Sequence, residues 1–198
     1  LDSQHYAEYS PRSDVMLLLS YNRADKTVKL LSFLRDSYVP VEGHRYDRLN
    51  TAYHFGGIGL AINTINETFD LDIQNYVTLA FSEFETLVDA IGGIDLSYED
   101  GTVAHFNGEE ALAFVRNRKF GEGDFGRTAR QRRFMQALYQ KVRNELSLQM
   151  LLELANFATD YIRTNLSTKE LINLAMELYS AGTLQVETGR MPFDGTWH

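Results

Sequence analysis

The stretch FVRNRKFGEGDFGRTARQRR, residues 114–133, concentrates cationic side chains in a chain that is acidic overall. The protein has 19 Lys and Arg against 27 Asp and Glu, yet seven of those cations lie between Arg116 and Arg133, and six of the seven are Arg. A guanidinium presents its N–H donors in a planar fork that matches the oxygens of phosphate or carboxylate. The block therefore predicts a local anion site, with a solvated run of charges as the alternative.

The elements expected around this block bring its arginines to two helix ends. One helix should end near Arg116 and Arg118, where cations interact favourably with the helix dipole. A second helix, from residue 128 to 145, would have Arg127 at its start, where positive charge is unfavourable unless an anion lies in front of it. Arg130 and Gln131, three and four residues after Arg127, share its side of the helix, and the Gly-rich link between the helices lets the backbone fold back. We therefore expect one anion site to be formed by Arg35, Arg116, Arg118, Arg127 and Gln131.

Carboxylates and arginines also gather near the N-terminus. The residues concerned are Asp2, Arg12, Asp14, Arg35 and Asp36. Residues 15–21 and 27–34 read as the two strands of a hairpin, so Asp14 and Arg35 should lie at the same end of the sheet. Since Mg²⁺ commonly takes one or two carboxylates and completes its shell with water and phosphate oxygens, this end is a candidate metal site. Ordinary surface ion pairs are the alternative.

Strands and helices alternate along the chain without internal repeats. Further strands are expected at 75–81, 94–98 and 183–188; helices at 57–69, from a Ser82/Glu85 capping box to Gly92, at 148–162, and from a Ser167/Glu170 capping box to 179; and a polar loop at 40–50. This alternation predicts an α/β protein, a three-layer α/β/α sandwich with a central mixed sheet, formed by residues 1–198 as one domain.

Composition excludes several classes of protein. The net charge of −8 and the pI of about 5.1 disfavour binding to nucleic acid. The absence of cysteine excludes disulfides and thiolate metal sites, and no apolar run is long enough to span a membrane. The start of the sequence lacks both a signal-peptide pattern and an initiator Met, so we expect the full-length protein to begin upstream.

Several stretches in order resemble the LytR–CpsA–Psr proteins of Gram-positive bacterial envelopes. They are RSDVMLLLSYN, LLSFLRDSYVPVEGHRYDRLNTAYHFGG, VDAIGGIDL, and FNGEEALAFVRNR with GDFGRTARQRRFM. The resemblance is strongest over residues 1–145. It implies a transferase that moves a phosphate-linked glycopolymer, such as wall teichoic acid or capsular polysaccharide, from a polyprenyl pyrophosphate carrier to peptidoglycan. It also implies an extracellular catalytic domain held at the cell membrane by an N-terminal anchor, with a strand before residue 1.

The resemblance also assigns roles to residues. The family's metal-binding acidic pair falls on Asp2 and Asp14, for Mg²⁺ or Mn²⁺. Its pyrophosphate-binding residues fall on Arg12, Arg35, Arg116, Arg118, Arg127 and Gln131. Of these side chains, Arg35, Arg127 and Asp14 are expected to be catalytic, with pyrophosphate cleavage as a side activity. The basic position of the family's YDKIN-like segment is occupied by Arg48.

Three points remain open from the sequence. A non-catalytic binder of polyprenyl phosphate or anionic envelope polymer is the alternative function, whereas a transcriptional regulator is disfavoured by the acidic pI and the lack of a helix-turn-helix pattern. The general base is either Asp14 or Asp36. Apolar residues after position 145 either line a lipid pocket or, for most of them, pack in the core; they include Met150, Leu151, Leu154, Phe157 and Met176.

Overall fold

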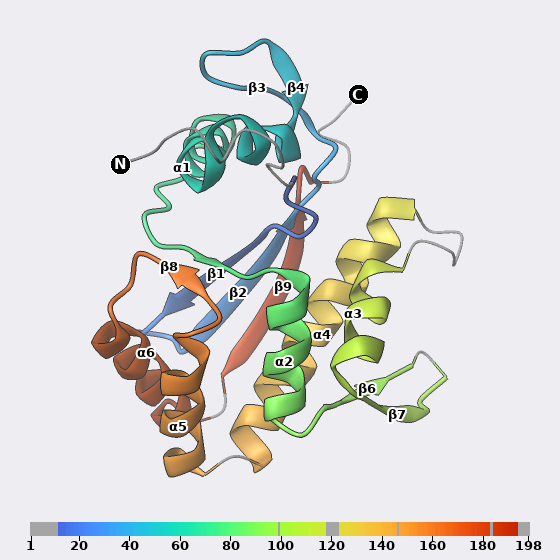
Figure 1. The fold of residues 1–198 in the computed structure, drawn as a ribbon, viewed down its shortest axis with the longest axis vertical. Helices are drawn as coiled ribbons and strands as arrows, with labels where there is room; N and C mark the ends of the chain where they lie inside the picture. Colours follow the sequence, from blue (N-terminus) through green and yellow to red (C-terminus); the bar gives the residue numbers. More distant parts are fainter. Residues whose placement is uncertain (1–11, 99, 118–122, 146, 183, 194–198) are drawn as a thin grey trace. The chain divides into compact units, whose positions relative to one another are not determined.

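The computed structural model describes residues 12–98, 100–117, 123–145, 147–182 and 184–193 (Figure 1). The chain divides into two compact units. Unit 1 comprises residues 1–19, 31–74 and 189–198, and unit 2 comprises residues 20–30 and 75–188. Helices and strands are interleaved along the chain, so the predicted α/β class is confirmed.

Three strands form a sheet in the order β1-β2-β9, and each strand has residues in both units. They are β1 (Leu17–Asn22), β2 (Thr27–Phe33) and β9 (Gln185–Met191). The predicted pair of neighbouring strands at 15–21 and 27–34 is confirmed, because the apolar run and the polar turn after it fix both strands. The last strand continues three residues beyond the predicted end at 188.

Unit 1 contains a hairpin and a long helix. The hairpin joins β3 (Tyr38–Pro40) to β4 (Tyr46–Arg48), and α1 (Leu49–Phe69) follows directly. The predicted loop at 40–50 is wrong in part, since β4 and the start of α1 lie within it. Non-helical backbone at Gly56 and Gly57 bends α1, and Gly57 has a φ of +63° that glycine adopts without steric cost. This kink explains why the sequence pattern indicated a helix only from residue 57.

The core of unit 1 is a cluster of apolar side chains from β2, β3 and α1. Its buried members are Phe33, Val39, Val41, Leu49, Ala52, Ala61 and Ile65. Leu49 and Ala52 are completely buried in the first turn of α1, so the helix starts against this core. The same packing holds the end of β2 and the β3–β4 hairpin in place. The candidate site residues of unit 1 lie next to these two elements.

Unit 2 carries the other helices and two short pairs of strands. Its elements are β5 (Val77–Thr78), α2 (Phe81–Ala90), β6 (Ile94–Ser97), β7 (Val103–Phe106), α3 (Gly108–Arg116), α4 (Gly123–Glu145), α5 (Leu148–Ala158), β8 (Arg163–Thr164) and α6 (Thr168–Ser180). Antiparallel pairing joins β5 to β8 and β6 to β7. One cluster of buried apolar residues is formed by α2, β6, α3 and α4.

Helix α3 is fixed tightly against α2 at its first turn. A Cβ on Gly108 would lie 2.3 Å from the backbone oxygen of Glu85, so only glycine allows this approach. The backbone N–H of Gly108 donates to Asp89 at 2.7 Å, and Asn107 and Glu110 form a capping box. These contacts set the direction of α3 and therefore the position of its last residue, Arg116.

Two expectations in unit 2 are wrong. The strand expected at 75–81 is reduced to β5, because α2 begins at Phe81. The Ser82/Glu85 capping box is absent: Ala80 is the N-cap without a side-chain hydrogen bond, and Ser82, already inside the helix, donates to Glu83. By contrast, the Ser167/Glu170 capping box is confirmed on α6, and hydrogen bonds from Ser167 lower the pKa of Glu170.

Candidate functional site

In unit 1, Arg35 holds two carboxylates at the end of β2. Its Nη1 lies 2.5 Å from Oδ1 of Asp14, and its Nε lies 3.5 Å from Oδ2 of Asp36. The Asp14 contact is a short charge-assisted hydrogen bond, the stronger class of such bonds. The predicted proximity of Asp14 and Arg35 is therefore confirmed, because the residues that flank β1 and β2 meet at one end of the pair.

Arg48 extends this arrangement into a series of alternating charges. Its Nη1 lies 3.8 Å from Oδ1 of Asp36. We call Asp14, Arg35, Asp36 and Arg48 the carboxylate–arginine chain. Arg35 is its most protected member, with 14% of its side chain exposed against 35–45% for the others. The formal charges of its two arginines and two carboxylates cancel. An incoming phosphate would therefore have to compete with these carboxylates for the N–H donors of the guanidinium groups.

In unit 2, α4 begins at Gly123, five residues before the predicted start at 128. Arg127 is thus the fifth helical residue, and Arg130 and Gln131 lie in the following turn. Because the effect of a helix dipole fades within the first turn, the argument that these arginines are placed unfavourably at a helix start is wrong. Packing against neighbouring elements, rather than the helix dipole, therefore determines the surroundings of Arg127, Arg130 and Gln131.

Packing buries the polar side chains on one side of α4. Arg127, Arg130 and Gln131 are 3%, 8% and 3% exposed, and we call these three residues the α4 polar cluster. A guanidinium of Arg130 donates to the backbone oxygen of Asn117, and Nε2 of Gln131 donates to the backbone oxygen of Val115 at 3.3 Å. Both oxygens belong to the end of α3, where carbonyls lack intrahelical partners. Arg130 and Gln131 therefore close the C-terminus of α3.

Arg116, the last residue of α3, stacks on an aromatic ring. Its guanidinium carbon lies 4.2 Å from the ring centre of Phe81, the first residue of α2. Such a cation–π contact holds the guanidinium over the ring, while its N–H donors can still form hydrogen bonds. Arg116 is exposed, so these donors can reach a solvent-borne anion.

The sequence-predicted site residues fall into three groups. Asp14 and Arg35 are in contact in unit 1, where Arg12 is exposed. Arg116, Arg127 and Gln131 belong to unit 2, around the junction of α3 and α4. Asp2 and Arg118 lie outside the described residues. That the two units bring these residues to one anion stays a prediction.

Two residues of this region were not among those proposed from the sequence. The sequence places Arg130 on the same side of the helix as Arg127 but assigns it no role, and it gives no sign of Phe81. The spacing of Arg127, Arg130 and Gln131 at i, i+3 and i+4 was a usable signal for a shared face. No pattern in the sequence pairs Phe81 with Arg116, because the contact depends on how α2 packs on α3.

The donor chemistry of the carboxylate–arginine chain is compatible with a hard divalent cation. Asp14 is about one-third exposed, so its carboxylate remains accessible. Within the described part of the chain, no cluster of three or more His, Cys, Asp or Glu side chains could hold a metal by itself. A cation bound here would therefore need oxygen ligands from substrate, water or residues beyond those described, which is the usual situation for Mg²⁺.

Unit 2 also has an open pocket of about 340 Å³ between β6 and α4. Asp95 and Ser97 line it from the strand, and Gln136, Gln140 and Asn144 line it from the helix. No member of the α4 polar cluster is among its lining residues. Arg133, the last residue of the arginine block, does line it, so the pocket adjoins other residues of α4 than the α4 polar cluster.

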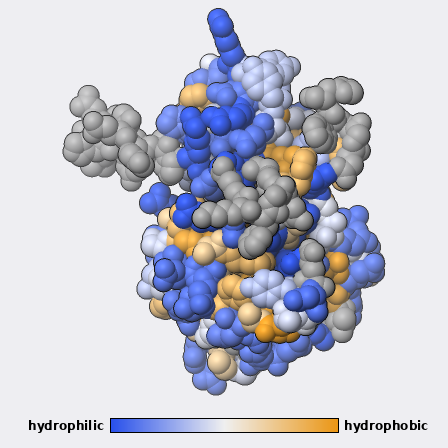
Figure 2. Space-filling model, turned by 90° about the vertical axis from the view of Figure 1, so that its right-hand side faces the viewer, coloured by the Kyte–Doolittle hydropathy of each residue, from blue (hydrophilic) through white to orange (hydrophobic). Residues whose placement is uncertain are grey.

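The apolar residues after position 145 are divided between core and surface. Leu151 is 7% exposed, whereas Met150, Phe157 and Met176 are 50%, 37% and 40% exposed. Core packing is thus wrong for these three, and a lipid pocket stays a prediction. Figure 2 shows hydrophobic patches bordered by hydrophilic residues on the face that it draws, which is the side of Figure 1 opposite α5 and α6. No helix among the described residues is long and apolar enough to cross a bilayer.

An α/β fold that presents arginines beside carboxylates and at the junction of two helices defines a candidate binder of phosphate-like anions. The chain belongs to the LytR_cpsA_psr family, whose model matches residues 1–198. The family prediction is therefore confirmed.

Relatives and solved structures support this membership. The chain is 34% identical over 182 residues to TagU of Enterococcus faecalis (strain ATCC 700802 / V583), named polyisoprenyl-teichoic acid--peptidoglycan teichoic acid transferase; the match covers 86% of this chain and 60% of that protein. It is 28% identical to B. subtilis TagV, with a TM-score of 0.77 over 89% of this chain and 76% of that one. The structure of TagT bound to LI-WTA is also 28% identical, with a TM-score of 0.75 over 91% of this chain and 72% of that one.

Proposed function

We propose that this protein transfers a phosphate-linked glycopolymer, of the wall teichoic acid or capsular polysaccharide type, from a polyprenyl pyrophosphate carrier to peptidoglycan. The observation that carries the proposal is the similarity, over 86% of the chain, to a relative named as a transferase of teichoic acid to peptidoglycan. The arginines at the end of β2, on α3 and on α4 supply the chemistry that such a phosphate-linked substrate requires.

The reaction is a phosphoryl transfer. A sugar hydroxyl of the acceptor attacks the phosphorus next to the glycopolymer, the bond to the bridging oxygen breaks, and polyprenyl phosphate leaves. Negative charge grows on the leaving phosphate as that bond breaks, so fixed guanidinium groups stabilise the transition state more than the ground state. We assign this role to Arg35 and Arg127, with Arg12, Arg116, Arg118 and Gln131 binding the pyrophosphate.

The hydroxyl proton needs an acceptor, for which Asp14 and Asp36 are the described candidates. Arg35 contacts both carboxylates and so keeps them oriented at the end of β2. With water in place of the sugar, the same chemistry cleaves the pyrophosphate, which gives the proposed side activity. Asp14 together with Asp2 would hold Mg²⁺ or Mn²⁺, which when bound supplies positive charge to phosphate oxygens.

We further propose that the protein acts at the outer face of the cell membrane, held there by an anchor upstream of residue 1. This setting gives access to a membrane-borne carrier and to peptidoglycan. It requires no affinity for nucleic acid, in agreement with the acidic surface charge.

The test is a reconstituted transfer reaction. Protein, Mg²⁺, a polyprenyl pyrophosphate-linked disaccharide and peptidoglycan oligomers are incubated together, and mass spectrometry measures the new phosphodiester and the released polyprenyl phosphate. Both products are expected. Tight binding of the donor without either product would replace the transferase by the alternative function, a non-catalytic binder of polyprenyl phosphate or anionic polymer.

A further inference from the structure

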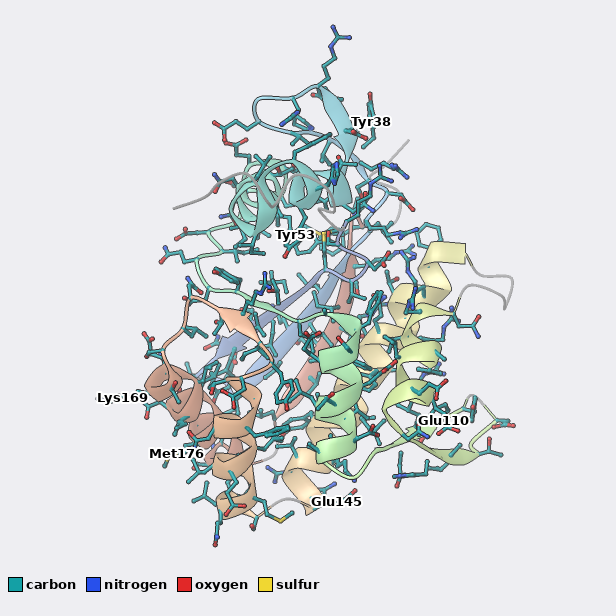
Figure 3. All side chains as sticks on the ribbon, viewed as in Figure 1. Tyr38, Tyr53, Glu110, Glu145, Lys169 and Met176 are labelled. Atoms are coloured by element: carbon teal, nitrogen blue, oxygen red, sulfur yellow. The ribbon has the colours of Figure 1, made fainter. Side chains whose placement is uncertain are left out.

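The outer face of the β3–β4 hairpin carries two tyrosines that are largely open to solvent. Tyr38 is 71% exposed, the highest value among the large hydrophobic side chains described, and Tyr46 is 59% exposed. Figure 3 shows Tyr38 projecting from the hairpin. Their ring centres lie 5.7 Å apart with the planes inclined by 34°. Two neighbouring rings of this kind present an extended aromatic surface, which is costly to leave in water without a ligand.

The register of the hairpin explains why both rings lie on one face. Tyr38 pairs with Arg48, and Pro40 pairs with Tyr46, in the antiparallel ladder. Because side chains alternate between the two faces of a strand, these four residues share the outer face, and Val39 points the other way into the core of unit 1. The aromatic surface is thus fixed by the backbone of the hairpin and by the burial of Val39.

Charged groups border this aromatic surface. Arg48 lies directly across from Tyr38, and its guanidinium is 3.8 Å from the carboxylate of Asp36. Asp36 and Arg48 are 44% and 45% exposed, so both can still donate to or accept from a ligand. A pyranose ring has an apolar face of C–H groups and an equatorial rim of hydroxyls. Aromatic rings match the face, and a carboxylate next to a guanidinium matches the rim.

Local charge distinguishes among possible ligands. Between Asp36 and Arg48 the chain carries three carboxylates and two arginines, so this segment has no excess of positive charge. An anionic polymer or an anionic lipid surface would gain little electrostatic attraction here. A neutral sugar has no such requirement.

We propose that the Tyr38–Tyr46 face binds a neutral pyranose ring of the acceptor glycan. The inference rests on the proposed function, for which the acceptor is peptidoglycan. Arg48 is adjacent to the rings and connects through Asp36 to Arg35 of the carboxylate–arginine chain. The face therefore holds the acceptor next to the residues to which we assign the attack on phosphorus.

The experiment measures binding of the neutral tetramer of N-acetylglucosamine by calorimetry, without any donor. Tyr38→Ala and Tyr46→Ala should each weaken binding roughly two- to tenfold, the range expected for loss of one aromatic contact. Tyr38→Phe keeps the ring and should stay within about twofold of the wild type. Tyr98→Ala is the matched control, because Tyr98 is 44% exposed but belongs to unit 2, and it should bind like the wild type.

Unchanged affinity in Tyr38→Ala, or loss of affinity in Tyr98→Ala equal to that in Tyr38→Ala, would overturn the proposal. So would a wild type that ignores the tetramer but binds anionic phosphatidylglycerol vesicles through Tyr38, which would make the face a membrane contact. Since the assay contains no donor, glycan binding that depends on Tyr38 can be found even if the protein transfers nothing. Conversely, if transfer occurs with the same KM for acceptor in wild type and Tyr38→Ala, only this inference fails.

Discussion

The carboxylate–arginine chain of unit 1 and the α4 polar cluster of unit 2 use the same type of side chain in opposite ways. In unit 1, carboxylates neutralise the guanidinium groups of Arg35 and Arg48, which remain partly exposed. In unit 2, Arg130 donates to a backbone carbonyl, a partner without formal charge, and it is almost completely buried. A carbonyl satisfies a donor but leaves the positive charge uncancelled. The difference is that Arg130 keeps its formal charge in a buried position, whereas unit 1 holds carboxylates in a fixed orientation.

The largest expected effect comes from replacing the guanidinium in unit 2 that we assign to catalysis. Arg127→Lys keeps the charge but loses the planar fork. We expect kcat for transfer to fall by roughly ten- to a thousandfold, the scale of about 1.4–4 kcal/mol for one electrostatic stabiliser, while affinity for the donor falls much less. Rapid-quench transfer assays and donor titrations measure the two quantities.

Arg163→Lys is the matched control, because Arg163 lies exposed on β8, and it should behave like the wild type. If Arg127→Lys transfers at the wild-type rate, Arg127 is a structural residue and the contrast between the two regions disappears. If donor affinity falls while the wild type itself shows no turnover, the binder is the better description.

The second expected effect concerns carboxylates in unit 1. If Asp14 helps to hold a divalent cation, removal of metal with EDTA should lower transfer at least about tenfold, and added Mg²⁺ should restore it. Asp14→Asn should weaken the dependence of the rate on Mg²⁺ concentration, whereas Asp95→Asn on β6 should leave it unchanged. Full activity in EDTA for the wild type would leave only arginines to stabilise the phosphate charge.

The sequence predicts the long elements of these two regions better than the short ones. The β1–β2 pair was predictable because a long apolar run, a polar turn and a second apolar run leave little choice, and with it came the contact of Asp14 with Arg35. The β3–β4 hairpin was not, since YVP and YDR are three residues each and show almost no alternation. Tertiary burial of Val39, rather than local propensity, makes them strands.

In unit 2, the sequence predicts that arginines are clustered but not which groups they contact. The GEGDFG segment reads as a linker because glycine disfavours helix by about 1 kcal/mol per residue, yet its last four residues begin α4. The carbonyls of Val115 and Asn117 at the end of α3 are visible only once the two helices are packed. A sequence indicates that arginines are clustered, but it does not indicate which backbone oxygens they satisfy.

A third prediction sharpens the contrast through stability. Arg130→Met keeps much of the apolar stem but leaves the carbonyl of Asn117 without its donor. The cost should be about 1–3 kcal/mol, the penalty of an unsatisfied buried polar group, which lowers Tm by about 2–4 °C per kcal/mol for a chain of this size. Arg12→Met at an exposed site should change the free energy of unfolding by less than about 0.5 kcal/mol, which shifts Tm by at most about 2 °C. Equal shifts in the two variants would mean that the hydrogen bond to α3 contributes little.

The smallest effect on stability is expected from Asp36, at the more exposed end of the carboxylate–arginine chain. Asp36 contacts Arg35 at 3.5 Å and Arg48 at 3.8 Å, and its side chain is 44% exposed. Ion pairs in such surroundings contribute about 0–1 kcal/mol and are screened by salt. Asp36→Asn should therefore lower the free energy of unfolding by less than about 1 kcal/mol at low ionic strength, and by less still at about 1 M salt, where the Debye length is only about 3 Å.

Urea denaturation at two NaCl concentrations measures this effect, with Arg130→Met as the reference variant. Because Arg130 acts through a buried hydrogen bond, its effect should hardly change with salt. A salt-independent loss for Asp36→Asn would show that the carboxylate–arginine chain is screened from solvent as fully as the α4 polar cluster, and the two regions would then no longer differ in the way proposed.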